Sequence, residues 1–334
     1  MDREQEEMQF LGVFGIFKEA NKIIISCHKI LSQITLSLIL PLSLLILIHI
    51  EVSDVVFDKI IHNEVNLSET QVGSPKYDKI SDLISSEWTF LFLFKLVYLI
   101  FLLTFSLLST SAVVYTIACV YTARDLSFRK VMSVVPKVWK RVMVTFLWTF
   151  LAFFIYNVAA TIVMLFIFFL FFVFVSYKAG LGFLIVFSVI YVVGFVYLSL
   201  IWHLAGVVSV LEEARGIQAM NRSKALMKGK MLTAICIYGV LSLMTFGIQF
   251  AFQKLVVHGG VGNLGRVVYG VVCLLASVKL MLFGLVIQTV LYFVCKSYHH
   301  ENIDKSALSD HLEVYLGEYV PLTAKDVQLE QYHV

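Results

Sequence analysis

Charged side chains are scarce in this chain. Only 15% of its 334 residues are Asp, Glu, Lys or Arg, whereas 59% are hydrophobic, and the mean hydropathy is +0.87. A soluble domain has about 25% charged and about 45–50% apolar residues. One soluble fold cannot hide this much apolar surface. The composition therefore excludes a soluble globular protein and predicts that lipid surrounds most of the chain.

Processing signals and crosslinks are also lacking. The first ten residues, MDREQEEMQF, are acidic, whereas a cleavable signal peptide begins with a basic region. No lipidation box opens or closes the sequence, so we expect the first spanning helix to direct insertion. No cysteine falls in a segment expected outside the cell or in a lumen, which excludes a disulfide framework. The five cysteines are Cys27, Cys119, Cys236, Cys273 and Cys295.

Long apolar runs are abundant instead. Stretches of about 18 or more apolar residues predict membrane-spanning helices. We predict an all-α polytopic bundle, with a cytosolic N-terminus at 1–30, a transmembrane domain at 31–295 and a cytosolic tail at 296–334. None of the 23 Asp and Glu residues falls inside the predicted spans. The six spans are expected at about 31–50, 88–121, 143–176, 183–210, 232–253 and 267–295.

The basic residues predict the orientation of these spans. Eighteen of the 26 Lys and Arg residues lie at the two ends of the chain and in the connectors 122–142 and 211–231, and six lie in the other connectors. Basic residues concentrate on the cytosolic side. We therefore predict an integral protein of the endoplasmic reticulum, another endomembrane or the plasma membrane, with both termini cytosolic. The segment 51–87 is then an outer loop, and Asn66 in its Asn-Leu-Ser motif is a glycosylation candidate.

The two basic connectors have helical periodicity. In each, the apolar residues share one face and the basic residues flank it. This pattern is typical of an amphipathic helix in the membrane surface, whose basic side chains reach lipid phosphates. A third such helix is predicted at 10–24. The candidate headgroup contacts are Arg129, Lys130, Lys137, Lys140, Arg141, Arg215, Arg222, Lys224 and Lys228.

Small residues in the second connector permit close helix packing. Its spaced residues are Glu213, Gly216, Ala219, Ser223, Leu226 and Gly229. This spacing resembles the connector of six-span membrane families, including the membrane domain found with bacterial glycerophosphoryl diester phosphodiesterases. No phosphodiesterase domain accompanies it in this sequence, so the resemblance does not imply that activity.

The whole chain resembles a plant family of uncharacterised six-span membrane proteins. The resemblance runs through MQFLGVFGIFKEA, STSAVVYTIACVYTARDLSFRKVMSVVPKVWKR and VCKSYHHENIDKSALSDHLEVYLGEYVPL. Some members of that family are labelled as polyadenylate-binding-protein partners. The resemblance implies a six-span fold and no assigned chemistry.

Lys279 is the most unusual intramembrane residue. It lies 12 residues after position 267, which is about 18 Å into the last span. A charge at that depth costs at least about 2.5–3.5 kcal/mol. We expect Lys279 to face the bundle interior, either as a site for an anion or headgroup or held by carbonyls or water. The candidate polar partners are Asn157, Gln249 and Gln288, and His203 is expected to be a hydrogen-bonded packing residue.

The tail offers the nearest approach to a catalytic motif. His299 and Asp304 have the His-x4-Asp spacing of glycerolipid acyltransferases. His299, His300, Asp310 and His311 are alternatively candidate zinc ligands. No arginine-containing phosphate motif accompanies them, and a polar tail helix explains the same residues. We therefore predict no catalytic, cofactor or metal site.

The leading hypothesis is a non-enzymatic scaffold or adaptor. It would organise membrane lipids, or protein partners at the cytosolic tail, and would not bind nucleic acid. A transporter or channel that uses Lys279 is the first alternative. A lipid-modifying enzyme is the second.

Overall fold

The computed structural model describes residues 8–122, 127–174, 177–259 and 262–300, and they are almost entirely helical. No strand occurs within these ranges. The elements are α2 (Val13–Ser26), α3 (His28–Ile34), η1 (Thr35–Ile39), α4 (Leu40–Ser68), α5 (Pro75–Tyr121), α6 (Phe128–Phe174), α7 (Tyr177–Leu211), α8 (Ile217–Leu226), α9 (Met231–Phe252), η2 (Gln253–Val257) and α10 (Asn263–Tyr298).

Six helices among the described residues are long and apolar enough to cross a membrane. The prediction of an all-α protein with six membrane-length helices is confirmed. These helices indicate an integral membrane protein. The six helices cover His28–Ser68, Pro75–Tyr121, Phe128–Leu170, Leu181–Leu211, Met231–Val257 and Asn263–Tyr298.

Two of these helices are far longer than a bilayer requires. Helices α5 and α6 each contain 47 residues, about 70 Å at a rise of about 1.5 Å per residue. The hydrocarbon core is about 30 Å thick. Both helices must therefore tilt strongly or extend beyond the lipid.

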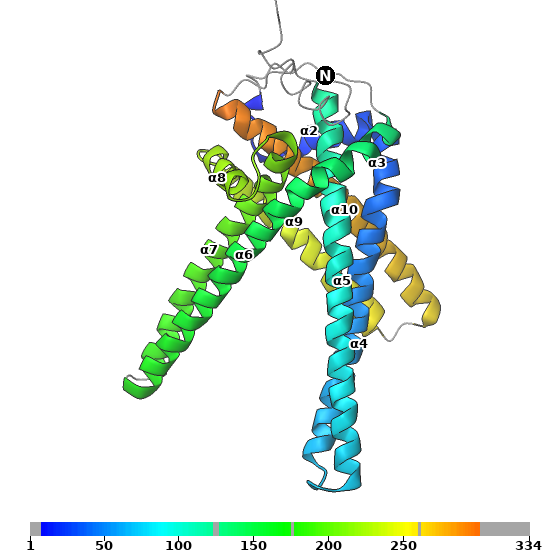
Figure 1. The fold of residues 1–334 in the computed structure, drawn as a ribbon, viewed down its shortest axis with the longest axis vertical. Helices are drawn as coiled ribbons and strands as arrows, with labels where there is room; N and C mark the ends of the chain where they lie inside the picture. Colours follow the sequence, from blue (N-terminus) through cyan, green and yellow to red (C-terminus); the bar gives the residue numbers. More distant parts are fainter. Residues whose placement is uncertain (1–7, 123–126, 175–176, 260–261, 301–334) are drawn as a thin grey trace, which may run out of the picture. The chain divides into compact units, whose positions relative to one another are not determined.

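The segment 51–87 is a helical hairpin and differs from the expected loop. Helix α4 continues to Ser68 and α5 begins at Pro75, so only residues 69–74 form the turn (Figure 1). Gly73 adopts φ +83°, a conformation that a side chain would strain. The two helices contact each other where Asn63 Nδ2 donates to Glu87 Oε2 at 3.0 Å. The charges that end the apolar run therefore do not end the helix.

The chain divides into two compact units. Unit 1 contains residues 1–16, 111–231 and 288–334, and unit 2 contains residues 17–110 and 232–287. The boundaries fall inside helices α2, α5 and α10 and directly after the first residue of α9.

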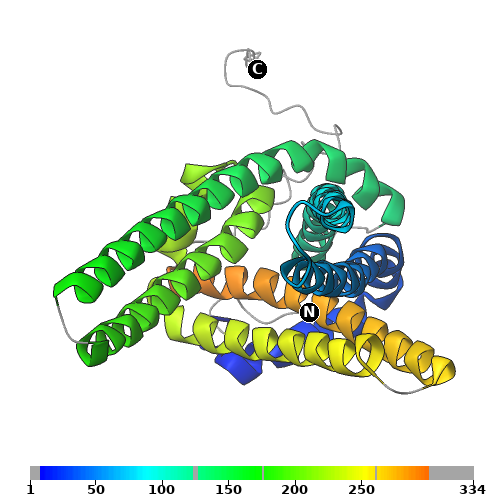
Figure 2. The same cartoon turned by 90° about the horizontal axis from the view of Figure 1, so that it is seen from below.

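In unit 1, α6 and α7 form an antiparallel pair. They run side by side in both views (Figure 1 and Figure 2). Phe153 packs edge-on against Phe195, with ring centroids 5.4 Å apart, and the Tyr156 hydroxyl donates to the Tyr191 carbonyl at 2.7 Å. The pairing places the beginning of α6 and the end of α7 at the same end of the unit.

In unit 2, the first half of α4 packs against the end of α9. Leu47, Phe252, Val256 and Cys273 form a buried hydrophobic cluster that joins α4, α9, η2 and α10. This cluster holds the end of α9 against the first half of α4.

The basic segment 124–141 is not a separate surface helix in the part that the structure describes. From Phe128 onward it forms the first turns of α6, which continues to Phe174. Val131, Val135 and Val138 are at most 1% exposed. The apolar face of this segment therefore packs against protein.

Candidate functional site

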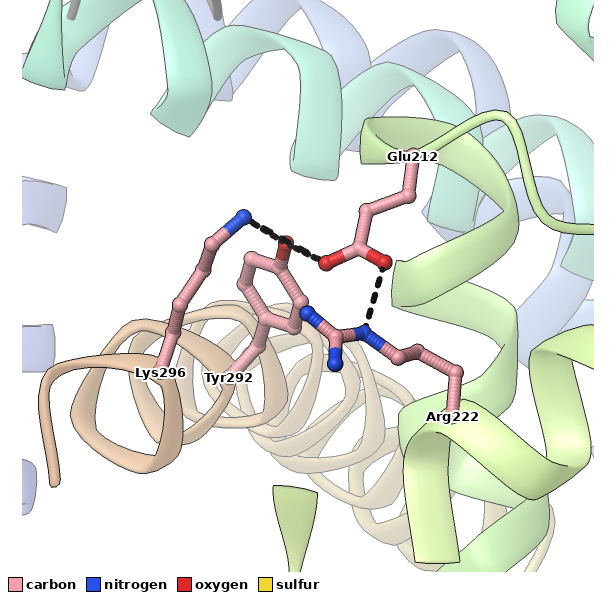
Figure 3. A network of polar contacts seen from close by, with 4 residues as sticks. All are labelled: Glu212, Arg222, Tyr292 and Lys296. Carbon is pink, nitrogen blue, oxygen red and sulfur yellow. Dashed lines mark hydrogen bonds and ion pairs between the residues drawn. The ribbon is translucent and has the colours of Figure 1, made fainter. Parts of the chain in front are cut away.

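A carboxylate at the end of α7 connects three helices of unit 1. Glu212 Oε2 accepts a hydrogen bond from Arg222 Nε at 3.1 Å, and Glu212 Oε1 accepts one from the Tyr292 hydroxyl at 2.7 Å. Lys296 Nζ lies 3.4 Å from Oε1 and 3.3 Å from the Tyr292 hydroxyl (Figure 3). We call these four residues the Glu212 network.

Three members of the network come from the ends of long helices, and Arg222 comes from the middle of a short one. Glu212 directly follows α7, Arg222 lies on the short helix α8, and Tyr292 and Lys296 lie on the last turns of α10. Tyr292 and Lys296 are four residues apart, which places both side chains on one face of α10. The network therefore ties the α7–α8 connector to the end of the last helix.

The network keeps Glu212 ionised. Burial raises the pKa of the Glu212 carboxyl, but the Tyr292 hydrogen bond and the Lys296 and Arg222 charges together lower it below its ordinary value of 4.5. The Glu212 side chain is 17% exposed, against 20% for Lys296 and 35% for Arg222. A carboxylate this buried is stabilised when donors occupy both of its oxygens.

The connector between α7 and α8 turns at Gly216. Its backbone has φ +60° and ψ −129°, a region open essentially to glycine alone. A Cβ atom added there would lie 2.8 Å from Trp148 Cδ1. The Gly216 N–H donates to Thr145 Oγ1 at 2.8 Å, and Thr145 Oγ1 also lies 2.7 Å from Ser209 Oγ. These contacts hold the start of α8 against both α6 and α7.

The rest of α8 is held through its small and apolar residues. The Ser223 hydroxyl donates to the Ile201 carbonyl at 2.9 Å, and Ala219 and Leu226 are at most 1% exposed. The Leu226 carbonyl lies 3.1 Å from His299 Nε2. The face of α8 expected to enter the lipid surface therefore packs against protein. Its open face carries Gln218, Asn221 and Lys224 together with Ile217, which is 48% exposed.

Gly229 and Glu213 are the remaining spaced residues of the connector. Gly229 has φ +87°, and the Tyr298 ring lies directly against the position that a Cβ atom would occupy. Glu213, by contrast, is exposed. The spaced connector residues thus have structural contacts, except for Glu213, whose neighbour Glu212 is the network carboxylate.

Most of the candidate headgroup residues are exposed. Arg141 is half-buried, and Arg222 donates to Glu212 and is thus partly engaged within the protein. The exposed members are Arg129, Lys130, Lys137, Lys140, Arg215, Lys224 and Lys228.

The described contacts divide the intramembrane polar residues into separate pairs. Asn157 Oδ1 accepts from the Tyr191 hydroxyl at 2.8 Å, between α6 and α7. The side chains of His203 and Gln288 hydrogen-bond to each other.

Lys279 and Gln249 belong to unit 2, where Lys279 is exposed and Gln249 is half-buried. Asn157, His203 and Gln288 belong to unit 1.

Two of the tail candidates, His299 and His300, and the glycosylation candidate Asn66 lie among the described residues. His299 contacts the Leu226 carbonyl, and His300 follows it with φ 52°. Asp304, Asp310 and His311 lie outside the described residues. Asn66 lies near the end of α4, and its carbonyl accepts from the Thr70 hydroxyl at 2.7 Å.

Sequence reasoning missed three network members, namely Glu212, Tyr292 and Lys296. The sequence does contain a signal for two of them. Tyr292 carries a hydroxyl and Lys296 a positive charge, and the two residues lie one helical turn apart where the last span ends. Such a pair suits an acidic partner. The sequence alone does not select that partner.

The fold and site define an all-α integral membrane protein with six membrane-length helices and a clamped polar connector. The chain matches, over residues 1–332, the model of the family described as a domain of unknown function, DUF8558. It belongs to that family. No curated protein and no solved structure matches the chain.

Proposed function

We propose that this protein is a non-enzymatic membrane scaffold that gathers anionic lipids at its basic connectors. The observation that carries the proposal is the contrast between the two faces of these connectors. Val131, Val135, Ala219 and Leu226 are buried on one face, while the basic residues are exposed on the other. Cations on the exposed face of a packed segment suit lipid phosphates.

Both connectors belong to one surface. The Thr145–Ser209 contact and the bond from Gly216 to Thr145 join the early part of α6 to the end of α7 and the start of α8. Cations from both connectors therefore lie at one end of the α6–α7 pair. Each Lys or Arg near an anionic membrane surface contributes about 1 kcal/mol of attraction.

The proposed orientation places this surface in the cytosol. The excess of Lys and Arg in the same connectors and at the chain ends supports cytosolic termini. The membrane is an endomembrane or the plasma membrane in this proposal. Protein partners are proposed at the cytosolic tail.

The test compares lipids retained by the purified full-length protein. In native mass spectrometry from detergent, the wild type is expected to retain phosphatidylserine in preference to phosphatidylcholine. A variant with five exposed cations replaced by Gln is expected to lose that preference by at least about tenfold. The five residues are Arg129, Lys140, Arg215, Lys224 and Lys228.

The matched control neutralises the exposed lysines of the α4–α5 hairpin, Lys59, Lys76 and Lys79. This control is expected to keep the wild-type preference. An unchanged preference in the connector variant, or an equal loss in the hairpin variant, contradicts the proposal. Monodisperse elution of each variant in size-exclusion chromatography verifies that it is folded.

A further inference from the structure

A second polar cluster lies in unit 2, away from the basic connectors in the sequence. Asp54 and Asp58 lie on α4, and His258 directly follows η2. One ligand atom from each lies within 4.8 Å of the other two. We call these three residues the Asp-Asp-His cluster.

Both ring nitrogens of His258 lie beside oxygen atoms that can only accept a hydrogen bond. Nδ1 lies 3.3 Å from the Gln253 carbonyl oxygen, and Nε2 lies 3.3 Å from Asp54 Oδ2. Both neighbours are acceptors only. A neutral imidazole carries one N–H, so it can donate to only one of them. Either a proton or a metal ion at Nε2 satisfies the other contact.

The carboxylates also favour a cation. Asp54 and Asp58 are four residues apart on α4 and share one face of the helix, where like charges repel. The Gln253 side-chain amide donates to Asp54 Oδ1 at 3.0 Å, which orients the carboxylate with its second oxygen toward His258. This is how outer hydrogen bonds orient metal-binding carboxylates and imidazoles.

The segment that carries His258 is rigidly supported. η2 is a π-helical turn, a feature frequent at functional sites. Arg266 from α10 donates to the carbonyls of Val256 at 2.7 Å and Val257 at 3.2 Å. Val256 also belongs to the buried cluster that joins η2 to α4. The backbone segments that carry the three side chains are therefore packed against each other, while Asp58 and His258 themselves are exposed.

We propose that the Asp-Asp-His cluster binds a divalent transition metal ion of the Zn²⁺ class. Two carboxylates and one imidazole are a donor set for zinc, with water in the fourth position, whereas Mg²⁺ and Ca²⁺ prefer oxygen ligands alone. Ligand atoms about 2.1 Å from a tetrahedral ion lie about 3.4 Å apart. Small side-chain rotations therefore bring the cluster, already within 4.8 Å, to binding distance.

The experiment uses the full-length protein in detergent, stripped of metal by a chelator. Isothermal titration with ZnCl₂ at pH 7.5 is expected to show one site per chain, and MgCl₂ none. His258→Gln and Asp54→Asn are each expected to weaken zinc binding at least about tenfold. Even the loss of an outer hydrogen-bond partner lowers metal affinity by about that factor. Zinc is expected to raise the thermal unfolding temperature of the wild type but not of either variant.

Two controls separate a metal site from an ion pair. His62→Gln changes another exposed histidine of α4 and is expected to leave zinc binding intact. His258→Arg keeps a positive charge beside Asp54 and is expected to keep metal-free stability while losing zinc binding. One-site zinc binding that persists in His258→Arg, or is lost equally in His62→Gln, overturns the proposal, as does no wild-type binding.

Discussion

The Tyr292 hydroxyl lies 2.7 Å from Glu212 Oε1, although the two residues are 80 positions apart. The bond joins the end of the fourth membrane-length helix to the end of the sixth. Arg222 and Lys296 complete the arrangement from α8 and α10. One carboxylate thus ties the α7–α8 connector to α10, which makes Glu212 the first residue to test.

Replacing Glu212 with Gln is expected to destabilise the protein. The substitution removes the charge that Arg222 and Lys296 share and leaves two cations close together. Charge-assisted hydrogen bonds contribute about 1.5–3 kcal/mol each, and solvent reaches part of Arg222, so we expect a loss of about 1–3 kcal/mol in the free energy of unfolding. Thermal and denaturant unfolding in detergent measures it.

The adjacent Glu213 is the matched control for this substitution. It is exposed and has the same chemistry one position away. Glu213→Gln is expected to change stability by less than about 0.5 kcal/mol. Equal effects of the two substitutions would show that the network does not stabilise the connector.

The Glu212 network also predicts how stability depends on pH. The pKa of the Glu212 carboxyl is lower in the folded protein than its ordinary value of 4.5, because donors on Tyr292, Lys296 and Arg222 outweigh the effect of burial. A carboxyl with a lowered folded pKa contributes stability that is complete above the unfolded value. This contribution is lost as pH falls through the folded value.

The measurement compares wild type with Glu212→Gln between pH 7 and pH 3.5. The wild-type advantage is expected to be constant from pH 7 to about pH 5.5 and to shrink below pH 4.5, the ordinary value of the carboxyl. An advantage that grows on acidification has the wrong sign and contradicts the lowered pKa.

The six membrane-length helices were predictable from the sequence because membrane insertion depends on local apolar length. The helical hairpin at 51–87 was not, because charges end an apolar run without ending a helix. The residue spacing of the connector selects Glu213 as a packing residue and does not select the adjacent Glu212, whose carboxylate contacts Arg222 and Tyr292. Neighbouring glutamates look alike in sequence, and only the folded structure distinguishes them. The insertion cost of Lys279 predicts that it faces the bundle interior. Its side chain is exposed on unit 2, and its substitution tests that prediction.

Gly216→Ala is expected to destabilise the connector by about 1–3 kcal/mol. Its φ of +60° with ψ of −129° strains any side chain, and the new Cβ would also press on Trp148. Gly206 in α7 is the control, because a Cβ there meets nothing within 4 Å. Gly206→Ala in this helix is expected to be neutral or stabilising. Unfolding measurements that rank the two variants in the reverse order would reject this role for Gly216.

Lys279→Met and Gln288→Leu are expected to have opposite effects on stability. Lys279 is exposed on α10, so removing its charge is expected to keep or raise thermal stability in lipid nanodiscs. Gln288 is 5% exposed and hydrogen-bonds to His203, so its replacement leaves a polar ring without that partner and is expected to cost about 1–3 kcal/mol. A large loss of stability in Lys279→Met would instead indicate a buried partner for the lysine and would favour the transporter alternative.

The proposed orientation predicts which of two similar sequons carries sugar. Asn66 lies in the α4–α5 hairpin, and Asn221 lies exposed on α8 beside the basic residues. Glycosylation takes place only on the lumenal side, so the protein from a glycosylating host is expected to carry one glycan, at Asn66. A glycosidase-sensitive shift in gel mobility is expected to disappear in Asn66→Gln and to remain in Asn221→Gln. A glycan on Asn221 would place the basic connectors in the lumen, and the proposed contact with anionic cytosolic lipids would then be wrong.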